Sequence, residues 1–204
     1  MIFQMQQPLF AKRSSRNRQI EITVHASLFL YLACMLLFLP IPWLLGALLS
    51  EGIHELSHYL ALRIMGIPVF RLTISAFGIK MKTGSMGTLQ EIVVSSAGPA
   101  AGIALIPLFR SVPEVAVCAL VHSAFNLLPI YPFDGGRVVN ALLSLIFKER
   151  CSRIVGKVIE LLTYLLLSFC AVLFMRYSMV VSLFSIAIFI RCMFNRLGNK
   201  QIDT

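Results

Sequence analysis

The segment EGIHELSHYL, which spans Glu51–Leu60, places two histidines and two glutamates inside an otherwise apolar stretch. His54 and His58 stand four residues apart, so on an α-helix their side chains differ by about 40° around the axis and both imidazoles can reach one metal ion. Glu55 directly follows the first histidine, as the general base does in the HExxH pattern. Zinc suits such ligands. The segment therefore predicts a zinc site on a helix, and the alternative is two histidines that only hydrogen-bond to neighbouring helices.

The composition predicts an integral membrane protein. Hydrophobic residues make up 58% of the 204-residue chain and the mean hydropathy is +0.84, whereas soluble domains contain roughly 45–50% apolar residues. Six apolar runs approach the roughly 17–25 residues that a helix needs to cross a bilayer. They lie near residues 24–39, 41–62, 90–109, 112–130, 155–175 and 178–194. We therefore expect an all-α membrane protein with about six transmembrane helices.

The charge distribution predicts the orientation of these spans. The net charge is +9, but the basic residues sit at the ends of the apolar runs and form no patch with interleaved aromatic residues, which argues against nucleic acid as a partner. If the N-terminus is cytoplasmic, all but Arg110 and Arg176 of the 18 Lys and Arg residues fall on the cytoplasmic side. We therefore expect a multi-pass protein of the cell membrane with both termini in the cytoplasm.

The polar interruptions are too short for a soluble appendage, so we expect a single membrane-embedded domain over residues 1–204. It would comprise a cytoplasmic arm at 1–20, a core with the candidate site at 21–147, and two additional spans with a tail at 148–204. The five cysteines show no CxxC spacing and are expected to be reduced packing residues.

Residues 69–83 read as a short β-hairpin on the cytoplasmic side. Apolar residues alternate on both sides of the turn signal AFG, at Leu72, Ile74, Ala76, Ile79 and Met81. The alternative is an amphipathic loop that rests on the lipid headgroups.

Two further motifs shape the surroundings of the site. In SSAGPAAG, Gly98 and Gly102 are four apart among small residues, so another helix can approach closely. In NLLPIYPFDGG, Pro129 and Pro132 end the fourth span. Irregular backbone at membrane depth must be buried in protein or line a wet cavity, so we expect this segment to border the site.

A catalytic zinc ion keeps three protein ligands and one open position, and the third ligand has two candidates. Glu51 lies one turn before His54 and would have to bend back along its own helix, so we favour it as a partner of an imidazole N–H. Asp134 comes from another element, and with an inward-running second and fourth span it arrives in the same cytoplasmic half as the histidines. We favour Asp134 and leave Glu51 open.

With these motifs the chain resembles the site-2 proteases, the intramembrane zinc metalloproteases of the M50 class. The resemblance is greatest to the sporulation members akin to the stage IV protease FB. The resemblance rests on HELSH, SSAGPAAG and FNLLPIYPFDGGR and covers roughly residues 20–147. It departs from the family at Ser57, where glycine is usual, at Gly102, where asparagine is frequent, and at Glu51, where an apolar residue is common.

The resemblance implies a role for each candidate residue. His54 and His58 would bind zinc, Glu55 would be the base, and Asp134 would be the third ligand within the family's Asp-Gly motif. Asn126 would line the site and bind the substrate backbone or the developing oxyanion, although a helix-to-helix hydrogen bond explains it as well. We interpret His122 as a packing or supporting residue. His25 also matches the family, but its role does not follow from spacing.

The predicted function is hydrolysis of a peptide bond within or beside a transmembrane segment of a membrane-tethered protein. The expected partners are that substrate, the lipid bilayer and an inhibitory membrane protein. The alternative is a zinc-binding transporter or scaffold; transport should require polar groups in both halves of the membrane, whereas these cluster in the inner half. Because a helical substrate must unwind before cleavage, we expect the 69–83 hairpin to pair with it by strand addition, with Ile74 and Ile79 as ladder positions.

Overall fold

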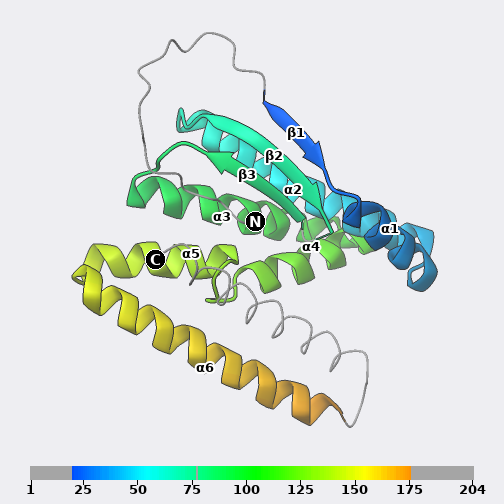
Figure 1. Ribbon diagram of the computed structural model, residues 1–204. Coiled ribbons are helices and arrows are strands. Elements are labelled where there is room, and N and C mark those ends of the chain that lie inside the picture. The colour runs from blue at the N-terminus through cyan, green and yellow to red at the C-terminus, as the bar shows by residue number, and fades with distance from the viewer. Residues whose placement is uncertain (1–19, 77, 176–204) are drawn as a thin grey trace.

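The computed structural model describes residues 20–76 and 78–175 (Figure 1). Three strands are formed by β1 (Glu21–Val24), β2 (Val69–Ser75) and β3 (Gly78–Thr83). The helices are α1 (Ser27–Phe38), α2 (Ile41–Ile64), α3 (Thr88–Ala104), the 3₁₀ helix η1 (Ile106–Arg110), α4 (Pro113–Asn126), α5 (Asp134–Ile146) and α6 (Glu149–Met175). The fold is mostly helical with one small sheet.

The sheet covers one side of α2 and α3 (Figure 1). Its strand order is β1-β2-β3, with β1 parallel and β3 antiparallel to β2. Alternate side chains of a strand face opposite sides, and the apolar set, which includes Leu72, Ile79 and Met81, packs against Leu62 of α2 and Val94 of α3. The sheet therefore fixes the relation of α2 to α3.

Helix α2 is the centre of the fold. Its buried residues recur at helical spacing and form one stripe: Leu44, Gly46, Ser50, His54, Glu55, His58 and Leu62. Helices α3 and α4 pack on α2, α5 packs on α3, and α6 packs on α5 (Figure 1). At Gly46 the backbones of α2 and α4 come so close that a Cβ would lie 2.9 Å from the carbonyl carbon of Glu114. The two histidines therefore point into a helical junction.

The predicted hairpin is confirmed. The expectation that the hairpin is the only β-structure in a helical protein is wrong, because the sheet has a third strand. The short strand β1 lies just before the apolar run at 24–39, where no strand was expected, and it extends the hairpin to three strands. The polar interruption between the expected spans at 112–130 and 155–175 contains helix α5. Its first turn contains Gly135 and Gly136, and because glycine has a low helix propensity the sequence did not suggest that a helix begins there.

The six predicted spans are not established. In the part of the chain that the structure describes, one helical stretch, Thr88–Arg110, is long and apolar enough to cross a membrane. Helices α1 and α4 have 12 and 14 residues, or roughly 18 and 21 Å at 1.5 Å per residue, less than the roughly 30 Å of a bilayer core. The run at 178–194, most of the N-terminal arm and Arg176 lie outside the described residues.

Candidate metal centre

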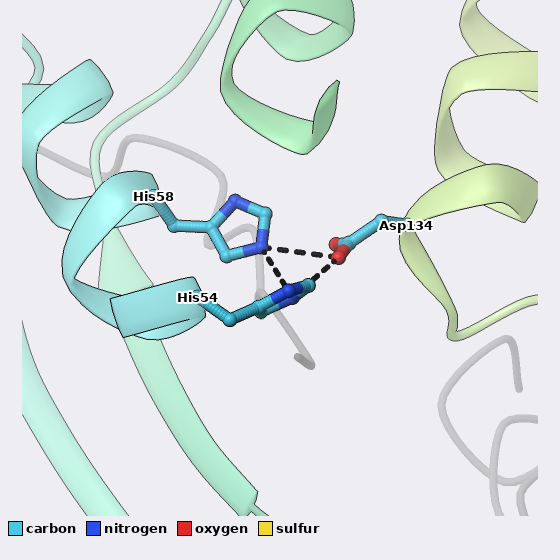
Figure 2. A group of neighbouring side chains, drawn as sticks. All are labelled: His54, His58 and Asp134. Carbon is cyan, nitrogen blue, oxygen red and sulfur yellow. Dashed lines mark hydrogen bonds and ion pairs between the residues drawn. The ribbon is translucent and has the colours of Figure 1, made fainter. Parts of the chain in front are cut away.

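His54 and His58 of α2 meet Asp134, the first residue of α5, and all three residues are buried (Figure 2). Asp134 Oδ2 lies 3.1 Å from His54 Nε2 and 3.0 Å from His58 Nε2, and the two Nε2 atoms are 3.1 Å apart. All three side chains are at most 2% exposed. Two residues one turn apart and a third from a distant helix thus direct one atom each at the same point.

The hydrogen bond of His58 determines what its second nitrogen can do. Nδ1 lies 2.7 Å from the carbonyl oxygen of Val94, and a carbonyl only accepts, so Nδ1 carries the proton of the neutral ring. His58 Nε2 then presents a lone pair to the carboxylate of Asp134. Converging lone pairs repel unless a cation lies between them. A tetrahedral zinc ion with bonds of roughly 2.0–2.1 Å separates its ligand atoms by roughly 3.3 Å, so the three atoms fit zinc.

Gly98 of α3 provides the space for such an ion. A Cβ on Gly98 would lie 2.6 Å from His54 Nε2 and closer still to His58 Nε2. The missing side chain thus leaves room where the ligand atoms converge. Gly102 instead permits close packing with α4, since its Cβ would meet Ser123 and lie 3.1 Å from the carbonyl oxygen of Ala119. The expected helix contact is therefore correct for Gly102, whereas Gly98 faces the imidazoles.

The segment at 127–133 brings Asp134 to the histidines. Helix α4 ends at Asn126, three residues before Pro129, and the chain turns through hydrogen bonds from Ile130 N to Leu128 O (2.7 Å) and from Phe133 N to Ile130 O (2.9 Å). Ile130 is completely buried. The prediction that this irregular segment borders the site is confirmed.

Close contacts then hold the start of α5 in place. A Cβ on Gly136 would lie 2.5 Å from the carbonyl oxygen of Ile130, so only glycine lets α5 pack this tightly on the preceding segment. Arg137 forms an ion pair with Glu91 of α3 at 3.2 Å. Asp134 lies in the first turn of α5, where the helix dipole favours a carboxylate. Its position is therefore set by its own helix, by α3 and by the segment before it.

The comparisons with known proteins point to one class. No family model matches the chain. A protein of Synechocystis described as a candidate zinc metalloprotease, sll0528, is 34% identical over 126 residues, which cover 50% of this chain and 33% of that protein. The candidate zinc metalloprotease Rip3 of Mycobacterium tuberculosis is 32% identical over 126 residues, covering 50% and 32%. The chain thus spans about a third of the length of these curated relatives.

The solved Site-2 Protease from Methanocaldococcus jannaschii superposes with a TM-score of 0.62 over 90% of this chain and 94% of that chain, at 20% sequence identity. The chain has a site-2 protease fold. Within this site-2 protease fold the three buried ligand atoms lie at the junction of α2, α3 and α5. No comparison distinguishes the sporulation members from the rest of the class.

The other predicted site residues lie near the centre but outside the ligand group. Glu55 is 5% exposed, and its Oε2 has no hydrogen-bond partner among the described residues. Asn126 is 8% exposed and donates from Nδ2 to the carbonyl oxygen of His122 at 3.1 Å. The helix-to-helix hydrogen bond considered for Asn126 is therefore a bond within α4. The roles of Glu55 as base and Asn126 as substrate ligand stay predictions.

Glu51 is not in the ligand group of His54, His58 and Asp134. A Cβ on Gly78 would lie 3.5 Å from Glu51 Oε1, which places the carboxylate at the turn between β2 and β3. His58 Nδ1 is held by Val94 instead, and His54 Nδ1 has no hydrogen-bond partner in the described part of the chain. A role for Glu51 as the partner of an imidazole N–H therefore stays a prediction.

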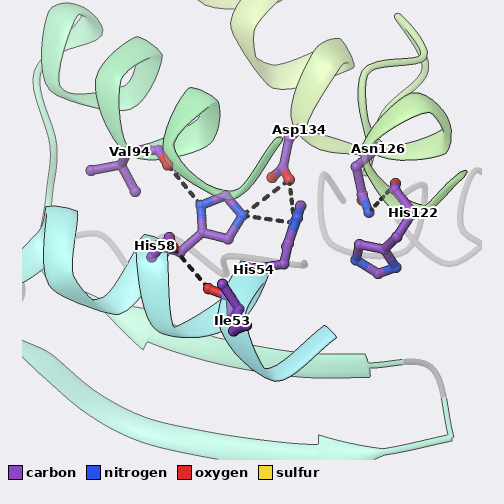
Figure 3. A network of polar contacts seen from close by, with 8 residues as sticks. Ile53, His54, His58, Val94, His122, Asn126 and Asp134 are labelled. Carbon is purple, nitrogen blue, oxygen red and sulfur yellow. Dashed lines mark hydrogen bonds and ion pairs between the residues drawn. The ribbon is translucent and has the colours of Figure 1, made fainter. Parts of the chain in front are cut away.

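The interpretation of His122 as a packing residue agrees with its ring contact, but the sequence did not show that the contact is with His54. Its ring packs edge-on against that of His54, with centroids 4.5 Å apart and planes at 83° (Figure 3). The sequence does indicate that His122 lies beside Asn126, because the two residues are four apart and share one face of α4. The contact with His54 depends on the packing of α2 on α4, which no local pattern reveals.

Proposed function

We propose that the protein is an intramembrane zinc metalloprotease of the site-2 type, which hydrolyses a peptide bond within or beside a transmembrane segment of a membrane-tethered protein. The observation that carries the proposal is the buried group of His54, His58 and Asp134, whose ligand atoms lie 3.0–3.1 Å apart beside the HExxH glutamate. Two relatives described as candidate zinc metalloproteases and the site-2 protease fold support it.

Glu55 would act as the general base. Bound zinc would supply Lewis acidity, which activates a water and polarises the scissile carbonyl. Glu55 takes a proton from the attacking water and passes it to the leaving amine. Its buried Oε2, which no described residue contacts by a hydrogen bond, is suited to accept that proton.

Asn126 would bind the substrate backbone. Its amide has two N–H donors and one carbonyl acceptor, and one donor is engaged by the carbonyl oxygen of His122. The second donor and Oδ1 are suited to the N–H and C=O groups of an unwound substrate. These groups lose their helical partners when the substrate unwinds, so replacement partners are needed.

The exposed surface supports a place in the cell membrane. Large apolar side chains point outward at the ends of several helices, with Leu37 and Phe38 of α1 each 80% exposed and Ile64 of α2 83% exposed. Such exposure is unfavourable in water and favourable in lipid. We propose a multi-pass protein with both termini cytoplasmic, a membrane-tethered substrate and an inhibitory membrane partner. A role in sporulation is proposed from the sequence motifs alone.

The first experiment separates metal binding from catalysis. We expect Glu55→Gln to retain about one zinc ion per chain but to lose cleavage, because only the base is removed. His54→Ala, His58→Ala and Asp134→Ala should each lose both. Metal analysis of the purified variants and cleavage of a tagged membrane substrate measure these outcomes. Full zinc and activity in Asp134→Ala would refute the third ligand, and loss of both in Glu51→Ala would point to Glu51 instead.

The second experiment tests the orientation. Topology reporters fused at Arg110 and Arg176 should report an external location, because the charge asymmetry places both outside. Reporters at the two chain ends should report the cytoplasm. A cytoplasmic signal at Arg110 would overturn the proposed orientation while leaving the metal centre untouched.

A further inference from the structure

His122 lies on the side of His54 opposite His58 and reaches the centre from α4 (Figure 3). Its Nε2 is buried and has no hydrogen-bond partner among the described residues. Buried polar atoms nearly always have a partner, and those that do not often serve a ligand or a reaction. His122 Nε2 is therefore a polar atom placed beside the candidate metal centre without a structural use.

His122 is not a support for His54 in the way that Val94 supports His58. The two rings are perpendicular, and no hydrogen bond joins them. His54 Nδ1 is also buried without a partner in the described chain. A supporting contact would have satisfied both nitrogen atoms at once. The edge-on packing leaves His122 Nε2 available for a third group.

The spacing of His122 and Asn126 suggests what that group is. The two residues are separated by one turn of α4, a rise of about 6 Å. In an extended chain, groups that face the same side recur at about 6.6 Å. The face of α4 thus presents two polar side chains at nearly the repeat of an extended polypeptide. A substrate that is unwound beside the centre carries unpaired C=O and N–H groups at this repeat.

We propose that His122 donates a hydrogen bond from Nε2–H to the carbonyl oxygen of the scissile peptide, while Asn126 binds a neighbouring peptide of the same extended segment. This inference rests on the proposed protease function. His122 is the residue of α4 that packs on the metal ligand His54, so it lies next to the position where the scissile carbonyl must bind. In this role the imidazole donates a hydrogen bond and transfers no proton.

The consequence is an effect on the rate of the chemical step. When water attacks, the carbonyl oxygen becomes an oxyanion, and a hydrogen bond to it strengthens in the transition state. An interaction that is stronger in the transition state than in the ground state raises kcat with little effect on KM. Loss of one such donor typically lowers kcat by roughly 10²–10³.

The test compares two substitutions in the zinc-loaded, full-length protein. His122→Phe keeps an aromatic ring but removes the donor, and His122→Gln keeps an N–H donor. We expect His122→Phe to lower kcat by about 100-fold with KM and zinc content close to wild type, and His122→Gln to recover at least about tenfold of the loss. Val121→Phe is the matched control, because Val121 is the preceding residue of α4 and its side chain points outward at 48% exposure.

A binding measurement makes the result independent of turnover. In the zinc-loaded Glu55→Gln background, His122→Phe should weaken binding of a phosphonamidate peptide, whose tetrahedral oxygens mimic the oxyanion, by about 100-fold. Binding of the uncleaved substrate peptide should weaken by no more than about threefold. If wild type binds zinc but cleaves nothing, the protease proposal fails, and the phosphonamidate comparison still decides the role of His122.

Three results would overturn the inference. The first is wild-type kcat in His122→Phe. The second is a fall in zinc content that parallels the fall in activity, which would make His122 a support for His54. The third is equal defects in the Phe and Gln variants, which would show that ring shape rather than hydrogen-bond donation matters. In each case cleavage by wild type with inactive Glu55→Gln would leave the proposed function standing.

Discussion

The two sides of the histidine pair differ in whether the imidazole nitrogens that do not face Asp134 have a hydrogen-bond partner. On the α3 side, His58 is held by the carbonyl oxygen of Val94, and Gly98 leaves room beside both Nε2 atoms. On the α4 side, His54 Nδ1 and His122 Nε2 are buried without partners among the described residues. The second nitrogen of the imidazole on the α3 side is therefore bound, although Ser95 Oγ of α3 is also buried without a partner among the described residues. On the α4 side these nitrogen atoms gain a hydrogen-bond partner only when a polar ligand binds, as we propose for the substrate.

The largest effect is expected from adding one carbon to the α3 side. In Gly98→Ala the new Cβ would lie 2.6 Å from His54 Nε2 and nearer to His58 Nε2, a separation that real Cβ atoms do not adopt. The imidazoles must move apart, so we expect at least about a 100-fold loss of zinc affinity and undetectable cleavage. Competition with a fluorescent zinc chelator measures the affinity.

Gly52→Ala is the matched control, because a Cβ there has nothing within 4 Å. Alanine also favours a helix over glycine, so both variants should remain helical by circular dichroism in detergent. Stoichiometric zinc and normal cleavage in Gly98→Ala would show that the metal ion does not bind in the space beside Gly98. The proposed difference between the α3 side and the α4 side would then be wrong.

A smaller effect should follow from displacing Asp134 alone. In Gly136→Ala the Cβ would lie 2.5 Å from the carbonyl oxygen of Ile130, which pushes the first turn of α5 away from the histidines. Two of three ligands stay in place. We therefore expect zinc affinity to fall by roughly 10–100-fold without complete loss. Titration with zinc should restore activity in this variant but not in Gly98→Ala, and equal behaviour of the two variants would contradict the distinction.

The parts of the site with local signals were predictable from the sequence. The spacing of His54 and His58 needs only one helix, and the prolines before Asp134 mark a chain reversal within a few residues. The hairpin likewise follows from alternation around a turn. Each of these features depends on residues close together in the chain.

The missed features all depend on contacts between distant segments. Strand β1 pairs with β2 across about 50 residues, with Glu21 opposite Arg71, and four residues give too short a pattern to reveal a strand. The packing of His122 on His54 requires α4 to lie on α2. Gly98 looked like a helix-packing residue because its motif contains only small side chains, which do not show what lies opposite.

The smallest expected effect concerns substrate presentation by the sheet, and the strand order corrects which residues can test it. Ile74 lies in β2, the central strand, so proline there would damage the sheet itself. Ser75 and Gly78 form the last pair of the hairpin before the connection, and hydrogen-bonded pairs alternate from such a closing pair. Thr73–Lys80 is then hydrogen-bonded, and Ile79 directs its N–H away from β2.

The open side of β3 is thus the edge to which an extended substrate can add, and Ile79→Pro removes a donor there without removing a bond to β2. We expect cleavage to slow by roughly tenfold, because one or two backbone hydrogen bonds are lost, with zinc content unchanged. Ile79→Val, which keeps the N–H, is the control. A membrane substrate whose helix-breaking Gly, Pro or Asn residues are replaced by leucine should also be cleaved more slowly. An unchanged rate in Ile79→Pro, or faster cleavage of the leucine substrate, would exclude strand addition at β3 and leave the face of α4 as the remaining candidate for binding the unwound chain.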